Sequence, residues 1–167
     1  KLFPSAIFGG SFALACQSML DRDVKDLDVI LSYENLSKPE LFELLKMKDS
    51  DRNVGSSYLG SNDGVVCQLN KKVQGVDVCI FIYQNCENIK WFNKTIYNNF
   101  TPSGYWKDNF DVRIQSFLQI KKVKENYVES WNNYCSDRNR WKENKSIEKH
   151  ESDIAFINKC EAVLTTF

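Results

Sequence analysis

Two aspartates stand two residues apart in a segment that otherwise has the composition of a buried strand. Residues 24–32 alternate in polarity and are rich in valine, isoleucine and leucine, which predicts a β-strand. Side chains two apart on a strand share a face, so Asp26 and Asp28 should project together while Leu27 and Val29 face the core. Adjacent carboxylates raise each other's pKa unless a cation lies between them, and Mg²⁺ binds such oxygens. The pair predicts a magnesium site, with a solvated acidic face as the alternative.

A third aspartate, Asp77, lies in the apolar run from Gly75 to Ile82. A carboxylate buried without a partner costs roughly several kcal/mol, so its presence in such a run requires a reason. We expect Asp77 to be a metal ligand shared with Asp26 and Asp28, because three carboxylates on neighbouring strands suit a two-metal site. A core aspartate held by hydrogen bonds is the alternative.

A glycine pair and a serine, Gly9-Gly10-Ser11, separate the apolar residues 5–8 from a predicted helix over Phe12–Leu20. Two glycines allow a sharp turn and a close approach of the backbone to a ligand. The first helical turn offers unpaired N–H groups and Ser11 adds a hydroxyl, so these residues are candidates for binding a phosphate. An ordinary turn is the alternative interpretation.

The remaining pattern predicts a mixed first half followed by helices. Val65–Leu69 and Gln74–Tyr83 should form an antiparallel hairpin with its turn at residues 70–72. Residues 49–63 should be a loop, and helices are expected after Lys38-Pro39, within residues 85–100, over Phe110–Trp131 and over Ile147–Leu164. We therefore predict an α/β (α+β) fold with a small mixed β-sheet and a helical C-terminal portion, divided near residues 102–104.

Composition limits the class of protein. The 167 residues carry no net charge, so no strong global field attracts the chain to nucleic acid or to an anionic membrane. The six cysteines form no C-x-x-C pair, which argues against a zinc ribbon or a redox motif. Their even number permits disulfides, but we expect free thiols in a reducing cytosol. Without a signal-peptide pattern or an apolar run of about 18 residues, we expect a cytoplasmic protein with no membrane partner. The abundance of lysine, asparagine and isoleucine is typical of an AT-rich genome, and together with the small size it suggests a phage or mobile-element origin.

The order of these segments resembles the nucleotidyltransferase superfamily typified by DNA polymerase beta. A Gly-Gly-Ser loop before a helix, a strand with two aspartates and a later strand with one match the family's motif over residues 6–31 and 75–82. The first of these stretches is also similar to the signature of tRNA CCA-adding enzymes, although Phe12-Ala13-Leu14 stands where those enzymes carry V-R-D. The length is closer to the minimal phage and bacterial members of the superfamily.

The resemblance implies transfer of an NMP group from an NTP such as ATP to an acceptor hydroxyl, with release of pyrophosphate. It implies two Mg²⁺ ions, with Mn²⁺ as a substitute, held by the catalytic residues Asp26, Asp28 and Asp77. The nucleotide-binding residues that it implies are Gly9, Gly10 and Ser11. The acceptor stays open among an RNA or tRNA end, a protein and a small molecule.

The resemblance also implies that a helical lysine steadies the triphosphate. Lys121 and Lys122 are the candidates, with a solvated basic face as the alternative. On this interpretation residues 1–102 are the nucleotidyltransferase catalytic core, and residues 103–167 are a helical portion packed on it. A different class of function also fits the sequence: a nucleotide- or partner-binding module, such as a sensor, decoy or inhibitor, on the same fold without turnover.

His150, the single histidine, falls on an apolar stripe with Ile147, Ile154 and Ile157, which predicts a core residue with its hydrogen bonds satisfied. The segment Lys149–Asp153 resembles a basic-acidic element near the C-terminus of small phage and bacterial nucleotidyltransferases, and ion pairing between helices is the alternative.

Basic and aromatic residues alternate over residues 131–145. They predict either a nucleic-acid surface or solvated helix faces.

Overall fold

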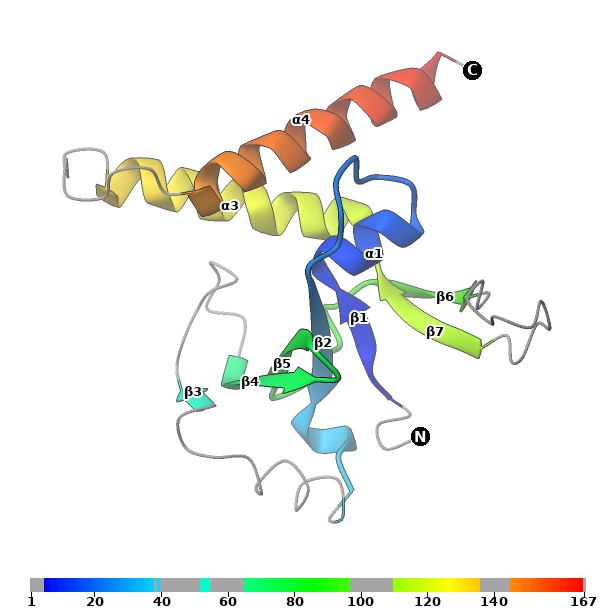
Figure 1. The fold of residues 1–167 in the computed structure, drawn as a ribbon, viewed down its shortest axis with the longest axis vertical. Coiled ribbons are helices and arrows are strands. Elements are labelled where there is room, and N and C mark those ends of the chain that lie inside the picture. The colour runs from blue at the N-terminus through cyan, green and yellow to red at the C-terminus, as the bar shows by residue number, and fades with distance from the viewer. Residues whose placement is uncertain are drawn as a thin grey trace.

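The computed structural model describes residues 5–37, 39, 52–54, 65–96, 110–135 and 145–166. The described strands form one seven-stranded sheet in the order β3-β4-β5-β2-β1-β7-β6. The strands are β1 (Ile7–Gly9), β2 (Asp26–Ser32), β3 (Arg52–Val54), β4 (Val65–Val73), β5 (Val76–Tyr83), β6 (Trp91–Ile96) and β7 (Phe110–Gln115). The helices are α1 (Gly10–Cys16), the short 3-10 helix η1 (Tyr33–Asn35), α3 (Phe117–Cys135) and α4 (Lys145–Thr165). The predicted α/β fold with a mixed sheet is therefore confirmed (Figure 1).

The sheet is mixed because two of its strand pairs are parallel. β2 runs parallel to β5 and β1 runs parallel to β7, whereas β1–β2, β3–β4, β4–β5 and β6–β7 are antiparallel. The parallel pairing of β2 with β5 brings together two strands that lie about fifty residues apart in the chain. It also fixes which of their side chains lie next to one another.

Alternation along β2 divides its side chains between the two faces of the sheet. Val29 and Leu31 pack on one face with Leu69 of β4 and Ile82 of β5. Ile30 packs on the opposite face, in a cluster completed by Ile7, Phe81 and Tyr83. The expected orientation of Val29 toward the core is thus confirmed, and Asp26 and Asp28 fall on the same face as Ile30.

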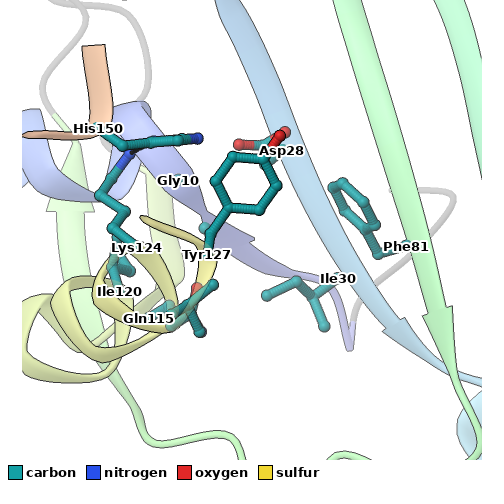
Figure 2. A pocket seen from close by; sticks show the side chains of 11 residues that line it. Gly10, Asp28, Ile30, Phe81, Gln115, Ile120, Lys124, Tyr127 and His150 are labelled. Atoms are coloured by element: carbon teal, nitrogen blue, oxygen red, sulfur yellow. Dashed lines mark hydrogen bonds between the residues drawn. The ribbon is translucent and has the colours of Figure 1, made fainter. Parts of the chain in front are cut away.

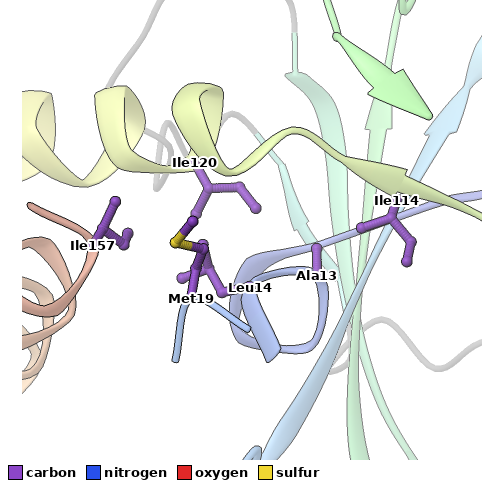
Figure 3. Packing of buried hydrophobic residues seen from close by; sticks show 6 residues of the cluster. All are labelled: Ala13, Leu14, Met19, Ile114, Ile120 and Ile157. Carbon is purple, nitrogen blue, oxygen red and sulfur yellow. The ribbon is translucent and has the colours of Figure 1, made fainter. Parts of the chain in front are cut away.

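A third apolar cluster joins the helices to the sheet. It contains Ala13 and Leu14 of α1, Met19 after α1, Ile114 of β7, Ile120 of α3 and Ile157 of α4 (Figure 3). Ile157 is fully buried, so the last helix is anchored in the same core as the first. Within the described residues, no helix combines the length and the apolar character needed to cross a membrane.

The helix predicted within residues 85–100 was wrong, and the helix predicted over Phe110–Trp131 is confirmed only from Phe117 onward. Residues 91–96 form β6, and residues 110–115 form β7, which pairs with β1 and β6, so the helical portion begins only at Phe117. Phe110, Val112 and Ile114 alternate with polar residues, a period of two that a helical spacing of four partly imitates. β6 and β7 pair with each other along their whole length. This pairing favours the strand over the helix, because the stability of a strand depends on the strand next to it.

The β4–β5 hairpin is confirmed, but its turn lies at Gln74-Gly75 rather than at residues 70–72. Both turn residues have positive φ, 49° at Gln74 and 84° at Gly75, as a tight two-residue hairpin turn requires. β3 falls within the expected loop 49–63. Apart from residue 39, the helix expected after Lys38-Pro39 falls on residues outside the described ranges.

Replacing Ile157 by alanine should lower the free energy of unfolding by about 2–5 kcal/mol, because it opens a cavity where α1, α3, α4 and β7 meet. Leu164→Ala on the same helix is the control. Its side chain is 61% exposed, so the change should stay within about 0.5 kcal/mol. Urea denaturation of both variants measures the difference, and equal losses would mean that Ile157 does not anchor α4.

Candidate functional site

Gly10 brings the start of α1 against the carboxylate of Asp28. Gly9, the last residue of β1, is paired with Asp28, and α1 begins at the next residue with a φ of 56° at Gly10. A Cβ atom on Gly10 would overlap the Asp28 carboxylate and lie 2.8 Å from its Cγ. A side chain at this position would therefore be strained and would displace Asp28, which accounts for the glycine.

The register of β2 with β5 sets the carboxylates side by side. Asp26 is the direct partner of Asp77, and Asp28 is the partner of Cys79. Partners in neighbouring strands point to the same face of a sheet, so all three aspartates lie on one face. The predicted neighbourhood of Asp26, Asp28 and Asp77 follows from this register.

Asp28 lies in an environment that disfavours its charged form. Burial raises the pKa of Asp28 to about 6, and the charge of Asp26 adds to the shift, whereas Lys124 and Lys149 oppose it. The expected repulsion between the two carboxylates is present, but desolvation is the larger cause. A cation next to Asp28 would stabilise the ionised carboxylate.

Asp77 is exposed, contrary to the expectation of a carboxylate inside an apolar core. Burial increases along β5 from Val76 to Tyr83, and Asp77 lies near the exposed end with 64% of its side chain accessible. Its Oδ1 atom accepts an ion-pair contact of 3.2 Å from Nζ of Lys72 on β4. Because Asp77 is not buried, the argument that its carboxylate needs a metal to offset the cost of burial does not apply.

The three aspartates share a face without converging on one point. Among the residues that the structure describes, no group of three or more His, Cys, Asp or Glu side chains is close enough to hold a metal ion. A cation bound between Asp26 and Asp28 would have to attract Asp77 away from Lys72 to gain a third carboxylate.

A cleft of about 400 Å³ opens above this face of the sheet. Strands β2 and β5 supply its carboxylates, helices α3 and α4 supply Lys124, Lys149 and His150, and strand β4 adds Lys71. The lining includes Gly10, Ser11, Asp26, Asp28, Asp77, Cys79, Lys124, Lys149 and His150. A smaller, mainly apolar cavity of about 70 Å³ adjoins the cleft between Asp28, Phe81, Gln115, Tyr127 and His150 (Figure 2).

A buried carboxylate on α4, Asp153, organises the basic side of the cleft. Its side chain is fully inaccessible and accepts hydrogen bonds from Arg22 at both oxygens, Nε to Oδ1 at 2.8 Å and Nη2 to Oδ2 at 2.7 Å. Nζ of Lys124 contacts the same Oδ2 at 3.0 Å. Burial alone would raise the pKa of Asp153, but the hydrogen bonds from Arg22 and the charge of Lys124 outweigh burial and lower it.

The two cations held by Asp153 both reach the candidate site. Nη2 of Arg22 donates a hydrogen bond of 2.9 Å to Oγ of Ser11, next to Gly10. Lys124 lines the cleft, and its Nζ lies 3.0 Å from Nδ1 of His150. Burial lowers the pKa of Lys124, and the contact with Asp153 offsets part of that shift. The network thus connects α4, α3 and the segment after α1.

His150 faces the cleft rather than the apolar core. Its ring packs edge-on against Tyr127 with centroids 5.0 Å apart, and Figure 2 shows Lys124 of α3 reaching toward it. Burial first, and then the charge of Lys124, lower the pKa of His150 to about 4. His150 is therefore neutral at pH 7, and its Nδ1 can accept a hydrogen bond from the Lys124 ammonium.

Neither predicted triphosphate lysine lines the cleft. Nζ of Lys121 donates to Oε2 of Glu161 on α4 at 2.7 Å, and Lys122 is exposed. Lys124 lies one turn from Lys121 and faces the carboxylates instead.

The sequence pattern could have indicated that Asp153 is buried. Residues 150, 153 and 157 fall on one helical face, and Ile157 on that face is buried.

No protein-family model matches this chain, and no curated protein and no solved structure matches it either.

Replacing Gly10 by alanine should destabilise the protein more than replacing Gly75. Both glycines have positive φ, so both variants carry a backbone strain of about 1–2 kcal/mol. A Cβ on Gly75 meets nothing within 4 Å, whereas a Cβ on Gly10 overlaps Asp28. Thermal unfolding measures the excess, and combining Gly10→Ala with Asp28→Ala should remove most of it. An excess that persists in the double variant would contradict the steric explanation.

Asp153→Ala should cost about 3–5 kcal/mol, because it leaves Arg22 and Lys124 without their buried counter-charge. The control is Glu161→Ala on the same helix. The Lys121–Glu161 pair is partly exposed, so its loss should cost at most about 1 kcal/mol. Urea midpoints of the two variants test the difference, and similar values would show that Asp153 is no more than a surface ion pair.

Proposed function

We propose that this chain is a metal-dependent nucleotidyltransferase that moves an NMP group from an NTP to an acceptor hydroxyl and releases pyrophosphate. The observation that supports the proposal best is the common face of Asp26, Asp28 and Asp77 on β2 and β5, in a cleft that Gly10 and Ser11 also line. The acceptor is an RNA or tRNA end, a protein or a small molecule, and ATP is the first nucleotide to test. The expected location is the cytoplasm.

The donors available in the cleft fit Mg²⁺. Carboxylate oxygens are ligands that this ion prefers, and Mn²⁺ accepts the same set. Asp26 and Asp28 would hold the ion. Asp77 would become a third ligand by giving up its ion pair with Lys72, and the loss of free energy would be small because that pair is largely exposed. When bound, the metal would offset negative charge on the phosphate oxygens and on the attacking oxygen.

Ser11 is oriented to bind a phosphate oxygen. Its Oγ atom already accepts a hydrogen bond from Arg22, so its own proton is directed elsewhere. Gly10 keeps the backbone beside Asp28 free of a side chain, so a phosphate can approach. Lys124 adds a positive charge on the opposite side of the cleft. These groups would hold the phosphates and leave the α-phosphorus near the carboxylates.

The transfer step needs one bond formed and one broken. The acceptor oxygen attacks the α-phosphorus in line, its proton passes to a carboxylate of the site, and the bond to the pyrophosphate leaving group breaks. The exposed position of Asp77 makes it the carboxylate that an acceptor entering from solvent reaches first. Positioning and charge stabilisation would supply most of the acceleration.

A nucleotide-binding module without turnover is the second candidate. It is favoured by the spacing of the acidic side chains, since the described residues contain no three that converge on a metal position. Such a module would use Ser11, Arg22 and Lys124 to hold a nucleotide and would need no third carboxylate.

The decisive experiment is transfer of label from α-labelled NTPs, with Mg²⁺ and with RNA, protein and small-molecule acceptors supplied separately. Asp26→Asn should lower transfer at least about a hundredfold, because it removes a ligand of the metal. Asp23→Asn is the control, since Asp23 is exposed and does not line the cleft. Both variants should unfold at the wild-type midpoint.

Transfer that survives Asp26→Asn would rule out the proposed chemistry at this site. Nucleotide binding without release of pyrophosphate from any NTP would support the binding module instead.

A further inference from the structure

The apolar cavity beside the cleft contains a buried amide side chain, that of Gln115 at the end of β7. Figure 2 shows Gln115 among the residues that line the cavity, and only 8% of its surface is exposed. An amide donates hydrogen bonds at one end and accepts them at the other, and a buried amide needs partners at both ends. The partners of Gln115 therefore decide what the cavity offers to a ligand.

A chain of hydrogen bonds fixes which end of the Gln115 amide faces the cavity. Oε1 of Gln119 on α3 accepts a hydrogen bond of 3.1 Å from the backbone N–H of Lys90, and its Nε2 donates to the carbonyl oxygen of Asn88 at 2.7 Å. Because Oε1 of Gln119 is an acceptor, Gln115 has to present its Nε2 there, and this bond is 3.1 Å long. Oε1 of Gln115 consequently lies at the end that does not face Gln119.

This oxygen has no donor within the part of the chain that the structure describes. The side chain of Gln115 makes the bond to Gln119, and Gln17 binds only its backbone oxygen. A Cβ atom on Gly9 would lie 2.8 Å from Oε1 of Gln115, so the missing side chain at Gly9 leaves room for the oxygen. A ligand that supplied a donor here would gain a hydrogen bond without breaking one inside the protein.

The walls of the cavity select the kind of group that can reach the oxygen. They are mainly aliphatic or aromatic, formed by Ile30, Phe81, Ile120, Val123 and Tyr127. Such surface disfavours an ionised group and suits a flat ring. A buried water needs about two to four polar partners, and these walls supply few of them.

The cavity opens into the larger cleft. The residues that line both spaces are Gly10, Asp28, Phe81, Lys124 and His150. The volume of about 70 Å³ exceeds the roughly 30 Å³ that one water occupies in the liquid, so one edge of a ring can enter while the rest of the molecule lies in the cleft.

We infer that this cavity binds the edge of a neutral planar ring that carries an N–H or amino group, which donates a hydrogen bond to Oε1 of Gln115. The ring belongs to a bound nucleotide or to a separate small molecule, since both can present the same edge. The inference stands apart from the proposed transfer reaction, because it depends on the fixed acceptor and the apolar walls and not on the carboxylates.

Titration of the isotope-labelled whole chain with aniline and with toluene tests the inference, with the backbone amide signals of Gly9 and Gly10 as the readout. The two probes have nearly the same shape, but only aniline carries a hydrogen-bond donor. Aniline should bind about tenfold more tightly than toluene, because it alone provides a donor for the buried oxygen.

Two variants of Gln115 assign this preference to its oxygen. Gln115→Met should remove the preference for aniline. Gln115→Glu is the matched control, because it also loses the bond to Gln119 but keeps acceptor oxygens, and it should retain the preference. Each comparison is between two probes on one protein, so a difference in stability between the variants does not affect it.

Three results would overturn the inference: equal affinities of the wild type for both probes, binding of neither probe, and a preference that survives Gln115→Met. Addition of ATP with Mg²⁺ identifies the source of the ring. Displacement of aniline would assign the cavity to the ring of the nucleotide, whereas aniline that stays bound beside ATP would assign it to a separate molecule. A preference for aniline in a protein that transfers no label would support the inference and remove the enzyme. Label transfer that depends on Asp26, without that preference, would do the reverse.

Discussion

The buried carboxylate of Asp153 is the contact on which the cleft depends. A charged group with no accessible surface is tolerated only when strong hydrogen bonds replace its lost hydration, and here Arg22 and Lys124 supply them. These partners come from the segment after α1 and from α3, so one side chain joins three parts of the chain. The hydroxyl of Ser11 and the ammonium of Lys124 take their positions from this junction, as does the turn of α4 that carries Lys149.

The central strands serve stability and the candidate site at the same time. On one face of β2, Val29 and Leu31 pack into a core with β4 and β5. On the other face, Ile30 continues an apolar cluster at one end, while Asp26 and Asp28 line the cleft at the other end. The carboxylates thus lie on strands that pair with a neighbour on each side and that pack against apolar clusters on both faces. Such mounting gives the acidic groups a defined spacing before any ligand arrives.

Local patterns predicted what depends on local geometry. Alternation along residues 24–32 was enough to place Asp26 and Asp28 on one face, and the two apolar runs after residue 65 were enough for a hairpin. The predictions that failed concern residues whose environment is set by contacts with distant parts of the chain. The apolar neighbours of Asp77 suggested burial, but Asp77 is the second residue of β5, next to the hairpin turn, and burial begins only further along the strand. Lys124 and Asp153 gain their importance from a partner, Arg22, that lies 131 residues from Asp153, a distance that no local window spans.

The separation of Arg22 from Asp153 also has a consequence for the order in which the molecule is made. Arg22 precedes Asp153 by 131 residues, so the glycine loop, both aspartates of β2 and the arginine leave the ribosome well before α4 does. A nascent chain can therefore pair its strands before α4 emerges, but the helical side of the cleft, which α3 and α4 share, is complete only when α4 has docked. Contacts of such long range close slowly, and this one delays the completion of the cleft until α4 has been translated.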